Sequence, residues 1–159
     1  MSWLTNHQLE NAVSRFADTK TKDAFLGVFA IDKLPSNIVK YPILLIVNTQ
    51  TSNLDGEHWF AIYISSHRRG EIFDSVLVPI DLRIRRWMNY FANSWRRNDR
   101  AYQSLLSPIC GAYVLYFILN RMNYETMNQL LCPKELKSCI NDSFIREWYR
   151  TLSMRKYKR

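Results

Sequence analysis

The chain is poor in the residues that interrupt regular structure. Its 159 residues include only 4 glycines and 5 prolines, which leaves little room for a flexible linker. No long apolar run is present, although a membrane-spanning helix needs about 20 such residues. The N-terminal stretch MSWLTNHQLENAVSRF also lacks the basic, apolar and small-residue order of a signal peptide. We therefore expect a single soluble domain over residues 1–159, made in the cytosol and not secreted.

Cysteine is scarce as well, and its arrangement excludes two kinds of site. The three cysteines, Cys110, Cys132 and Cys139, form an odd set without a C-x-x-C pair, which argues against both a disulfide framework and a zinc site. We therefore expect no metal, a reducing compartment, and a packing role for Cys132 and Cys139 among the C-terminal helices.

Acidic residues are outnumbered by basic ones. The chain has 22 lysines and arginines against 14 aspartates and glutamates, which gives a net charge of +8. Basic side chains crowd one segment with little acid to neutralise them, and the candidates for contact with nucleic acid there are Arg83, Arg85, Arg86, Arg96 and Arg97. DNA therefore fits as a polyanionic partner. A basic surface that only keeps the protein soluble accounts for the charge equally well.

Apolar residues make up 47% of the chain, which is enough for a full core. Four short runs are typical of β-strands because they are rich in β-branched and aromatic residues; these are FLGVFAI, YPILLIVNT, HWFAIYIS and EIFDS. The last two runs are joined by SHRRG, a polar turn whose Gly70 favours a hairpin.

Apolar residues at helical spacing predict the helices. The segment Thr5–Ala17 is amphipathic and starts with a T-x-x-Q capping box. The segment Ile80–Trp95 predicts one helix whose outer side carries the arginines. CGAYVLYFILN is apolar on all sides and predicts a buried helix that begins at Cys110, and YETMNQLL and DSFIREWYRTL predict two shorter helices. We expect an α+β fold, in which a mixed sheet of four or five strands is packed by the buried helix and by flanking helices.

The start of the buried helix is a favourable place for a reactive thiol. The free N–H groups and the dipole at a helix N-terminus favour a thiolate at Cys110, and His58 is the candidate to accept the thiol proton. Antiparallel pairing of the two hairpin strands places His58 and Asp74 at the same edge of the sheet, where a carboxylate can orient the imidazole. Gln103, seven residues before Cys110, is available as an amide donor for an oxyanion.

Each of these four residues also has a purely structural interpretation. Free cysteine is among the most buried residue types, an aspartate such as Asp74 often caps a turn, and His58 and Gln103 could lie on the surface. It is the combination of four roles in compatible places that favours catalysis.

The same residues carry a resemblance to a known family. The segments FLGVFAIDKLPSN, LLIVNTQTSNLDGEHWFAIYI, IFDS and QSLLSPICGAYVLYFIL resemble the adenovirus-type (adenain-like) cysteine endopeptidases, which share a clan with the proteases that process SUMO and related ubiquitin-like proteins. The resemblance covers roughly residues 25–119. It rests on a strand ending in V-N-T, a G-x-H-W, a glutamine seven residues before a C-G, and the order His, acid, Gln, Cys.

The resemblance implies a role for each member of the site: His58 as general base, Asp74 as its orienting acid, Gln103 as an oxyanion-hole donor and Cys110 as nucleophile, with Trp59 packed near them. Adenoviral members usually carry Glu where this chain has Asp74, whereas the SUMO-processing relatives carry Asp. The chemistry needs no cofactor. Adenoviral enzymes are stimulated by DNA and by a disulfide-tethered peptide; the arginines fit a DNA role here, but no cysteine precedes Cys110.

These observations predict a maturation protease of a virus or virus-like element. Its substrates would be capsid and core precursor proteins, and it would act as a monomer in the virion and in the cytoplasm or nucleus of the infected cell. The alternatives are a deconjugating protease for SUMO or other ubiquitin-like modifiers, an acetyltransferase on the same scaffold, and a basic nucleic-acid-binding protein with a non-catalytic protease fold. The first is favoured because the compact basic chain lacks the long N-terminal region common in deconjugating enzymes.

Overall fold

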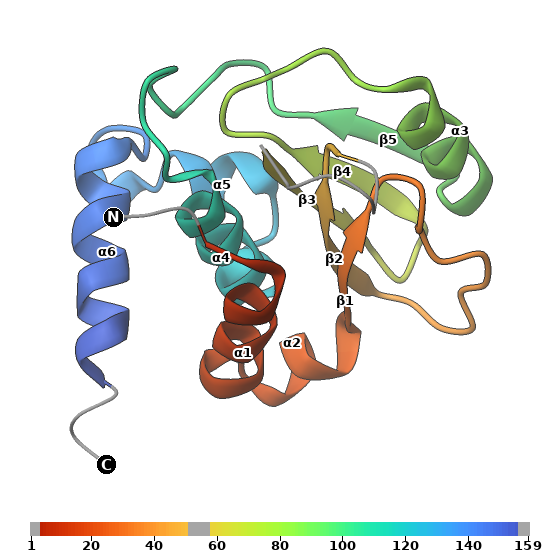
Figure 1. Cartoon of the computed structure of the whole chain (residues 1–159), viewed down its shortest axis with the longest axis horizontal. Coiled ribbons are helices and arrows are strands. Elements are labelled where there is room, and N and C mark those ends of the chain that lie inside the picture. Colours follow the sequence, from red (N-terminus) through yellow and green to blue (C-terminus); the bar gives the residue numbers. More distant parts are fainter. Residues whose placement is uncertain (1–3, 51–57, 156–159) are drawn as a thin grey trace.

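A mixed five-stranded sheet organises the computed structural model of the chain, which describes residues 4–50 and 58–155 (Figure 1). The strands are β1 (Phe25–Ala30), β2 (Ile43–Asn48), β3 (Trp59–Ile64), β4 (Arg69–Phe73) and β5 (Ser94–Arg97). The α-helices are α1 (Asn6–Phe16), α2 (Thr19–Ala24), α3 (Leu82–Phe91), α4 (Cys110–Asn120), α5 (Met127–Leu131) and α6 (Asp142–Met154). Two single 3₁₀ turns follow α4 and α5, at Arg121–Asn123 and Lys134–Leu136. The α+β fold predicted from the sequence is confirmed.

The sheet has the spatial order β1-β2-β3-β4-β5. The two central pairings, β2 with β3 and β3 with β4, are antiparallel, whereas β1 pairs with β2 and β4 pairs with β5 in parallel. The β3–β4 register sets Ala61 opposite Phe73. The residue before β3 and the residue after β4 therefore lie at the same end of the sheet, as the predicted hairpin requires.

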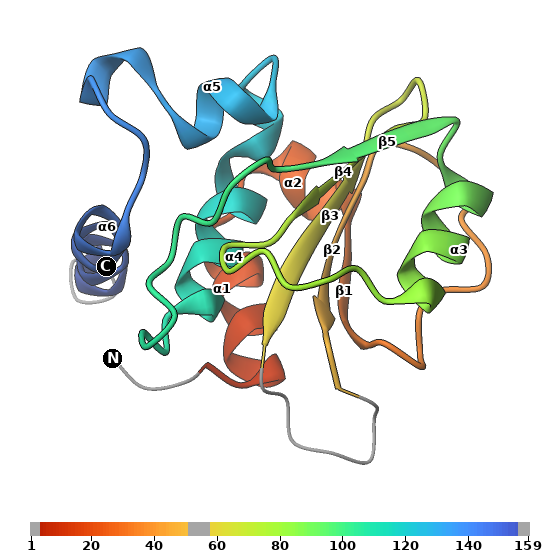
Figure 2. The ribbon, with the colours of Figure 1, turned by 90° about the horizontal axis from the view of Figure 1, so that it is seen from above.

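Helices cover both faces of this sheet (Figure 2): α1 and α4 lie on one face and α3 lies on the other. All six residues of β2 are buried, which is why its first five residues are all apolar instead of alternating. The first ten residues of α4 are buried as well, so the prediction of a buried helix beginning at Cys110 is confirmed. The helix packs between the sheet and the N- and C-terminal helices.

The N-terminal helix has the predicted capping box. Gln8 N–H donates to the Thr5 hydroxyl, and Thr5 N–H donates to the Gln8 side chain at 2.8 Å. The short helix α2 was not predicted, because its sequence TKTKDA has no apolar period to reveal it. It forms because the Asp18 carboxylate caps Thr21 N–H at 2.9 Å.

The segment predicted as one helix from Ile80 to Trp95 is in fact a helix followed by a strand, so that prediction is wrong beyond Phe91. Ala92 takes an extended conformation and ends α3, and the next residues pair with β4 as β5. Trp95, which lies in β5, happens to continue the helical spacing of the apolar residues of α3. The chain forms a strand here because the backbone N–H and C=O groups at the edge of β4 need hydrogen-bond partners, which a parallel strand supplies.

Gly70 lies within β4 and not in the hairpin turn, which corrects a second expectation. The left-handed turn residue is Arg68, with φ of 57°. At Gly70, a Cβ atom would stand 2.6 Å from the Met88 side-chain end and 3.0 Å from Trp95 Cβ. Close packing of α3 and β5 therefore requires the glycine.

Cys132 and Cys139 form a disulfide across seven residues, so the prediction of unpaired packing residues is wrong. Cys132 ends α5, and the Ile140 N–H donates to the Leu131 carbonyl at 2.8 Å, which folds the chain back and brings the two sulfurs together. A search for C-x-x-C spacing could not detect this loop. The expectation of a reducing compartment, which relied on unpaired thiols, loses its basis.

Candidate active site

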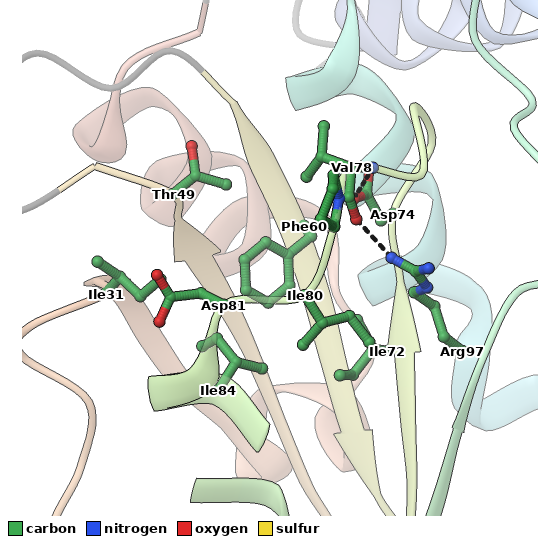
Figure 3. A pocket seen from close by; sticks show the side chains of 11 residues that line it. Ile31, Thr49, Phe60, Ile72, Asp74, Val78, Ile80, Asp81, Ile84 and Arg97 are labelled. Atoms are coloured by element: carbon green, nitrogen blue, oxygen red, sulfur yellow. Dashed lines mark hydrogen bonds between the residues drawn. The ribbon is translucent and has the colours of Figure 1, made fainter. Parts of the chain in front are cut away.

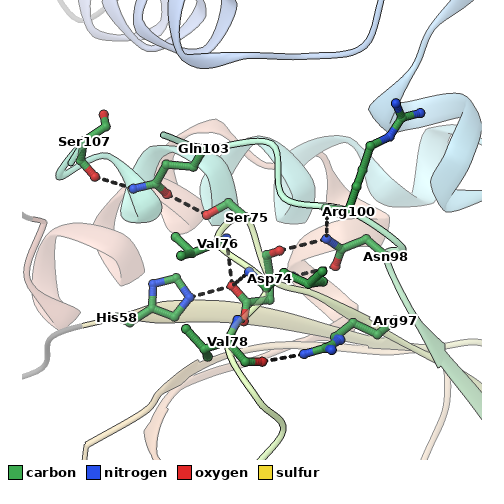
Figure 4. A network of polar contacts seen from close by, with 11 residues as sticks. His58, Asp74, Ser75, Val76, Val78, Arg97, Asn98, Arg100, Gln103 and Ser107 are labelled. Carbon is green, nitrogen blue, oxygen red and sulfur yellow. Dashed lines mark hydrogen bonds and ion pairs between the residues drawn. The ribbon is translucent and has the colours of Figure 1, made fainter. Parts of the chain in front are cut away.

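The structure brings His58 and Asp74 into direct contact. His58 immediately precedes β3 and Asp74 immediately follows β4, and the His58 Nε2 lies 2.6 Å from the Asp74 Oδ1 (Figure 4). A carboxylate can only accept, so Nε2 donates and Nδ1 is left for another partner. Gly56 of the G-x-H-W motif lies outside the described residues.

Asp74 is held by the turn that follows it. The carboxylate, which is almost fully buried, accepts N–H groups from Val76 and Leu77 at 3.0 Å and from Val78 at 2.9 Å. Leu77 adopts a left-handed conformation with φ of 65°, which wraps the backbone around the carboxylate. Burial alone would raise the pKa of Asp74, but the hydrogen bond and charge of His58 and these backbone donors hold it below its usual value.

A buried amide fixes the backbone of Asp74, and sequence reasoning missed it. Asn98 Oδ1 accepts the Asp74 N–H at 2.9 Å, while Asn98 Nδ2 donates to the carbonyls of Asp74 and Arg100 at 2.8 Å each (Figure 4). Asn98 directly follows β5. The sequence predicts a helix as far as Trp95 and no strand before Asn98, so it gives no signal for this contact.

Cys110 is the second partner of His58. It is the first residue of α4, is 1% exposed, and is the free cysteine of the described residues. Burial by itself would lower the pKa of His58, but hydrogen bonds with Asp74 and Cys110 and the charges of both raise it to about 9. A protonated imidazole beside a sulfur at a helix N-terminus is the arrangement that stabilises a thiolate in cysteine-dependent enzymes.

Gln103 lies in the loop 98–109 between β5 and α4, and it is buried. Its Oε1 accepts the Ser75 hydroxyl at 2.6 Å, and its Nε2 donates to the Ser107 carbonyl (Figure 4). The amide is therefore fixed in orientation within the loop that leads into Cys110. Trp59, the first residue of β3, is buried in the same core cluster as Cys110.

The predicted nucleic-acid contacts are divided between two elements. Arg83, Arg85 and Arg86 belong to α3 as expected, whereas Arg96 and Arg97 belong to β5 and do not lie just past the end of a longer helix.

The expectation that these arginines lack acidic partners is wrong for two of them. Arg83 pairs with Asp81 at 3.0 Å and Arg96 pairs with Glu71 at 3.3 Å. Arg97 is half-buried and donates to the Val78 carbonyl (Figure 4). Arg85 and Arg86 remain exposed, with Arg85 stacked 5.9 Å over Trp95.

A cavity of about 150 Å³ lies behind the acid, on the face of the sheet that α3 covers (Figure 3). Phe60, Ile72 and Ile84 line it together with Asp74 and Arg97. His58 and Cys110 do not line this cavity. The cavity is therefore separate from the imidazole and the thiol of the candidate site.

No metal-binding cluster and no membrane-spanning helix appear in the part of the chain that the structure describes. Within residues 4–50 and 58–155, no group of three or more His, Cys, Asp or Glu side chains could hold a metal ion. No helix in these ranges has the length and apolar character needed to cross a membrane.

Comparisons with known proteins bear on the fold. No protein-family model matches the sequence, and no curated protein matches it significantly. Two crystal structures of the ASFV pS273R protease, one of them with selenomethionine, are similar with TM-scores of 0.64 and 0.63 at 18% and 17% identity. The alignments cover 92% of this chain and 66% of that protease, so the chain spans just under two thirds of its length.

A third solved structure, the central domain of an uncharacterised protein, Lpg1148, from Legionella pneumophila, is similar with a TM-score of 0.54 at 12% identity. That alignment covers 96% of this chain and 99% of the domain. The chain therefore shares the α+β fold of the ASFV pS273R protease.

Proposed function

We propose that this protein is a cysteine endopeptidase that hydrolyses peptide bonds through an acyl-enzyme on Cys110. The observation that carries the proposal is the hydrogen bond of the His58 imidazole to the buried Asp74 carboxylate. Cys110, at a helix N-terminus, acts on the same imidazole and helps to raise its pKa. Its occurrence in a cysteine protease fold supports the same chemistry. The resemblance to adenain-like enzymes, found from sequence motifs alone, gives His58, Asp74, Gln103 and Cys110 the same roles.

The proposed reaction is a sequence of proton and bond changes. The Cys110 thiolate attacks the carbonyl carbon of the scissile bond, and the oxyanion that forms accepts N–H groups from the Gln103 amide and the Cys110 backbone. His58 gives its Nδ1 proton to the amine nitrogen as the C–N bond breaks, which leaves a thioester. The neutral imidazole then takes a proton from water, the hydroxide attacks the thioester, and the thiolate leaves. Asp74 holds the Nε2–H throughout and keeps the imidazole oriented.

The substrates we propose are structural precursor proteins of a virus or virus-like element. The fold similarity to the ASFV pS273R protease supports a viral protease, and the resemblance to maturation proteases supports this class of substrate. A deconjugating protease for ubiquitin-like modifiers would use the same residues and differ in the surface around them.

DNA binding through the basic surface is a further part of the proposal. Arg85 and Arg86 are exposed on α3, where Arg83 is already paired with Asp81, and they would hold a phosphate backbone without reading the bases. Fluorescence anisotropy with unrelated duplexes should show binding that weakens steeply as salt rises, because counterions are released from the phosphates. A DNA affinity that does not change with salt concentration would mean that these arginines only keep the protein soluble.

The experiment that tests the proposed function combines a thiol-directed activity probe with cleavage of a peptide library, in the parent protein and in Cys110→Ala. We expect probe labelling and cleavage in the parent and neither in the variant. A library that includes Gly-containing sites and a ubiquitin-like fusion separates the two substrate classes. A folded parent that takes up no probe and cleaves nothing would favour the non-catalytic, nucleic-acid-binding alternative.

A further inference from the structure

Ser75 directly follows the acid Asp74 and is fully buried. Its hydroxyl donates to the Gln103 Oε1 at 2.6 Å. Its carbonyl oxygen accepts the Gln103 N–H at 3.0 Å and the Tyr102 N–H at 2.8 Å. The carbonyl oxygen and the hydroxyl of one buried serine therefore hydrogen-bond to the backbone and the side chain of Gln103, respectively.

These contacts determine which end of the Gln103 amide points where. The Ser107 carbonyl can only accept a hydrogen bond, so the amide must present Nε2 to it. The Oε1 end is then turned to the Ser75 hydroxyl, which donates. Figure 4 shows Gln103 stretched between these two serines. With one Nε2 hydrogen used and the amide plane fixed at both ends, the direction of the remaining N–H is fixed as well.

We propose that Ser75 is a positioning residue that aims the Gln103 amide at the oxyanion of the acyl-transfer reaction, an inference that depends on the proposed function. Without the hydroxyl, the buried Oε1 loses its donor, and the amide can turn so that its orientation is no longer unique. The dipeptide Asp74-Ser75 then serves both halves of the site. Its first residue orients the base, and its second orients the oxyanion donor.

The test uses Ser75→Ala, with Ser75→Gly as a second hydroxyl-free variant and Ser14→Ala, at an exposed position of α1, as the matched control. All are compared with Gln103→Ala and with the Ser75→Ala/Gln103→Ala double variant. Hydrolysis of the p-nitrophenyl ester of an N-acylated glycine gives kcat and KM for a reaction that forms an oxyanion. Alkylation of Cys110 by iodoacetamide forms no oxyanion and reports the His58–Cys110 pair.

We expect Ser75→Ala to lower kcat by roughly tenfold, which is less than the hundredfold typical for removing an oxyanion donor outright. KM and the alkylation rate should stay at the parent values. In the Gln103→Ala background, Ser75→Ala should change kcat by less than about twofold, because residues that act through one another are not additive.

Four results would overturn the inference. Parent-like kcat in Ser75→Ala means that the hydroxyl does not aim the amide. Additive losses in the double variant, or loss of folding in both Ser75→Ala and Ser75→Gly, mean that the serine acts only on the stability of the chain. A folded parent protein with no ester or peptide turnover overturns the proposed function and this inference together, and so differs from failure of the inference alone.

Discussion

The proton on His58 provides the sharpest test of the site. Moving the pKa of His58 from 6.5 to about 9 corresponds to roughly 3 kcal/mol of preference for the protonated form, at about 1.4 kcal/mol for each pH unit. Because the folded-state pKa is raised, this contribution to stability is fully present below pH 6.5 and is lost as pH rises through about 9. Amide hydrolysis needs the same proton for the leaving group, so activity should fall over the same alkaline range.

Asp74→Asn removes the charge that holds this proton. Burial, which lowers the pKa of His58, would then be opposed only by Cys110. We expect the pKa of His58 to fall by more than about one pH unit and the alkaline limb of peptide hydrolysis to move down with it. Some turnover should remain, since an asparagine can still accept a hydrogen bond from the imidazole.

The assay is a pH–rate profile of peptide hydrolysis, together with NMR titration of labelled histidines in which the exposed His7 and His67 act as internal references. Asp81→Asn is the matched control, because Asp81 caps α3 and pairs with Arg83. A His58 titration that is the same in the parent and in Asp74→Asn would refute the reasoning, and so would an alkaline limb that does not move.

Three further predictions concern neighbouring residues. His58→Ala should abolish peptide turnover in steady-state kinetics, because His58 is the base proposed for the Cys110 thiol. Near-normal activity would mean that another residue is the base. Gln103→Ala should lower kcat on the order of a hundredfold with KM unchanged, and Gln103→Glu should be worse because it sets a negative charge beside the oxyanion. Glu71→Ala should lower the free energy of unfolding, measured by urea titration, by about 3–5 kcal/mol. The buried Arg121 donates to Glu71 at 2.6 and 3.0 Å and would lose its carboxylate partner. An unchanged urea midpoint would show that the pair is not coupled to folding.

Much of the fold was predictable because its elements are long and strongly patterned. The buried helix at Cys110 and the hairpin that brings His58 to Asp74 follow from apolar runs and from the geometry of antiparallel pairing. The disulfide was not predictable, because it depends on a backbone hydrogen bond that returns the chain after α5. Neither was β5, a four-residue strand whose sequence continued the period of the preceding helix.

The error over β5 matters for the candidate site, since this strand supports the turn that carries Asp74. Arg97, its last residue, donates to the Val78 carbonyl, and Asn98, the next residue, holds both backbone groups of Asp74. A parallel strand beside β4 is therefore what positions the acid. Arg97 points into this network and is only half-exposed, so its charge is engaged with the protein and not offered to phosphate. Arg97, one of the five arginines predicted to contact nucleic acid, thus serves the turn that carries Asp74.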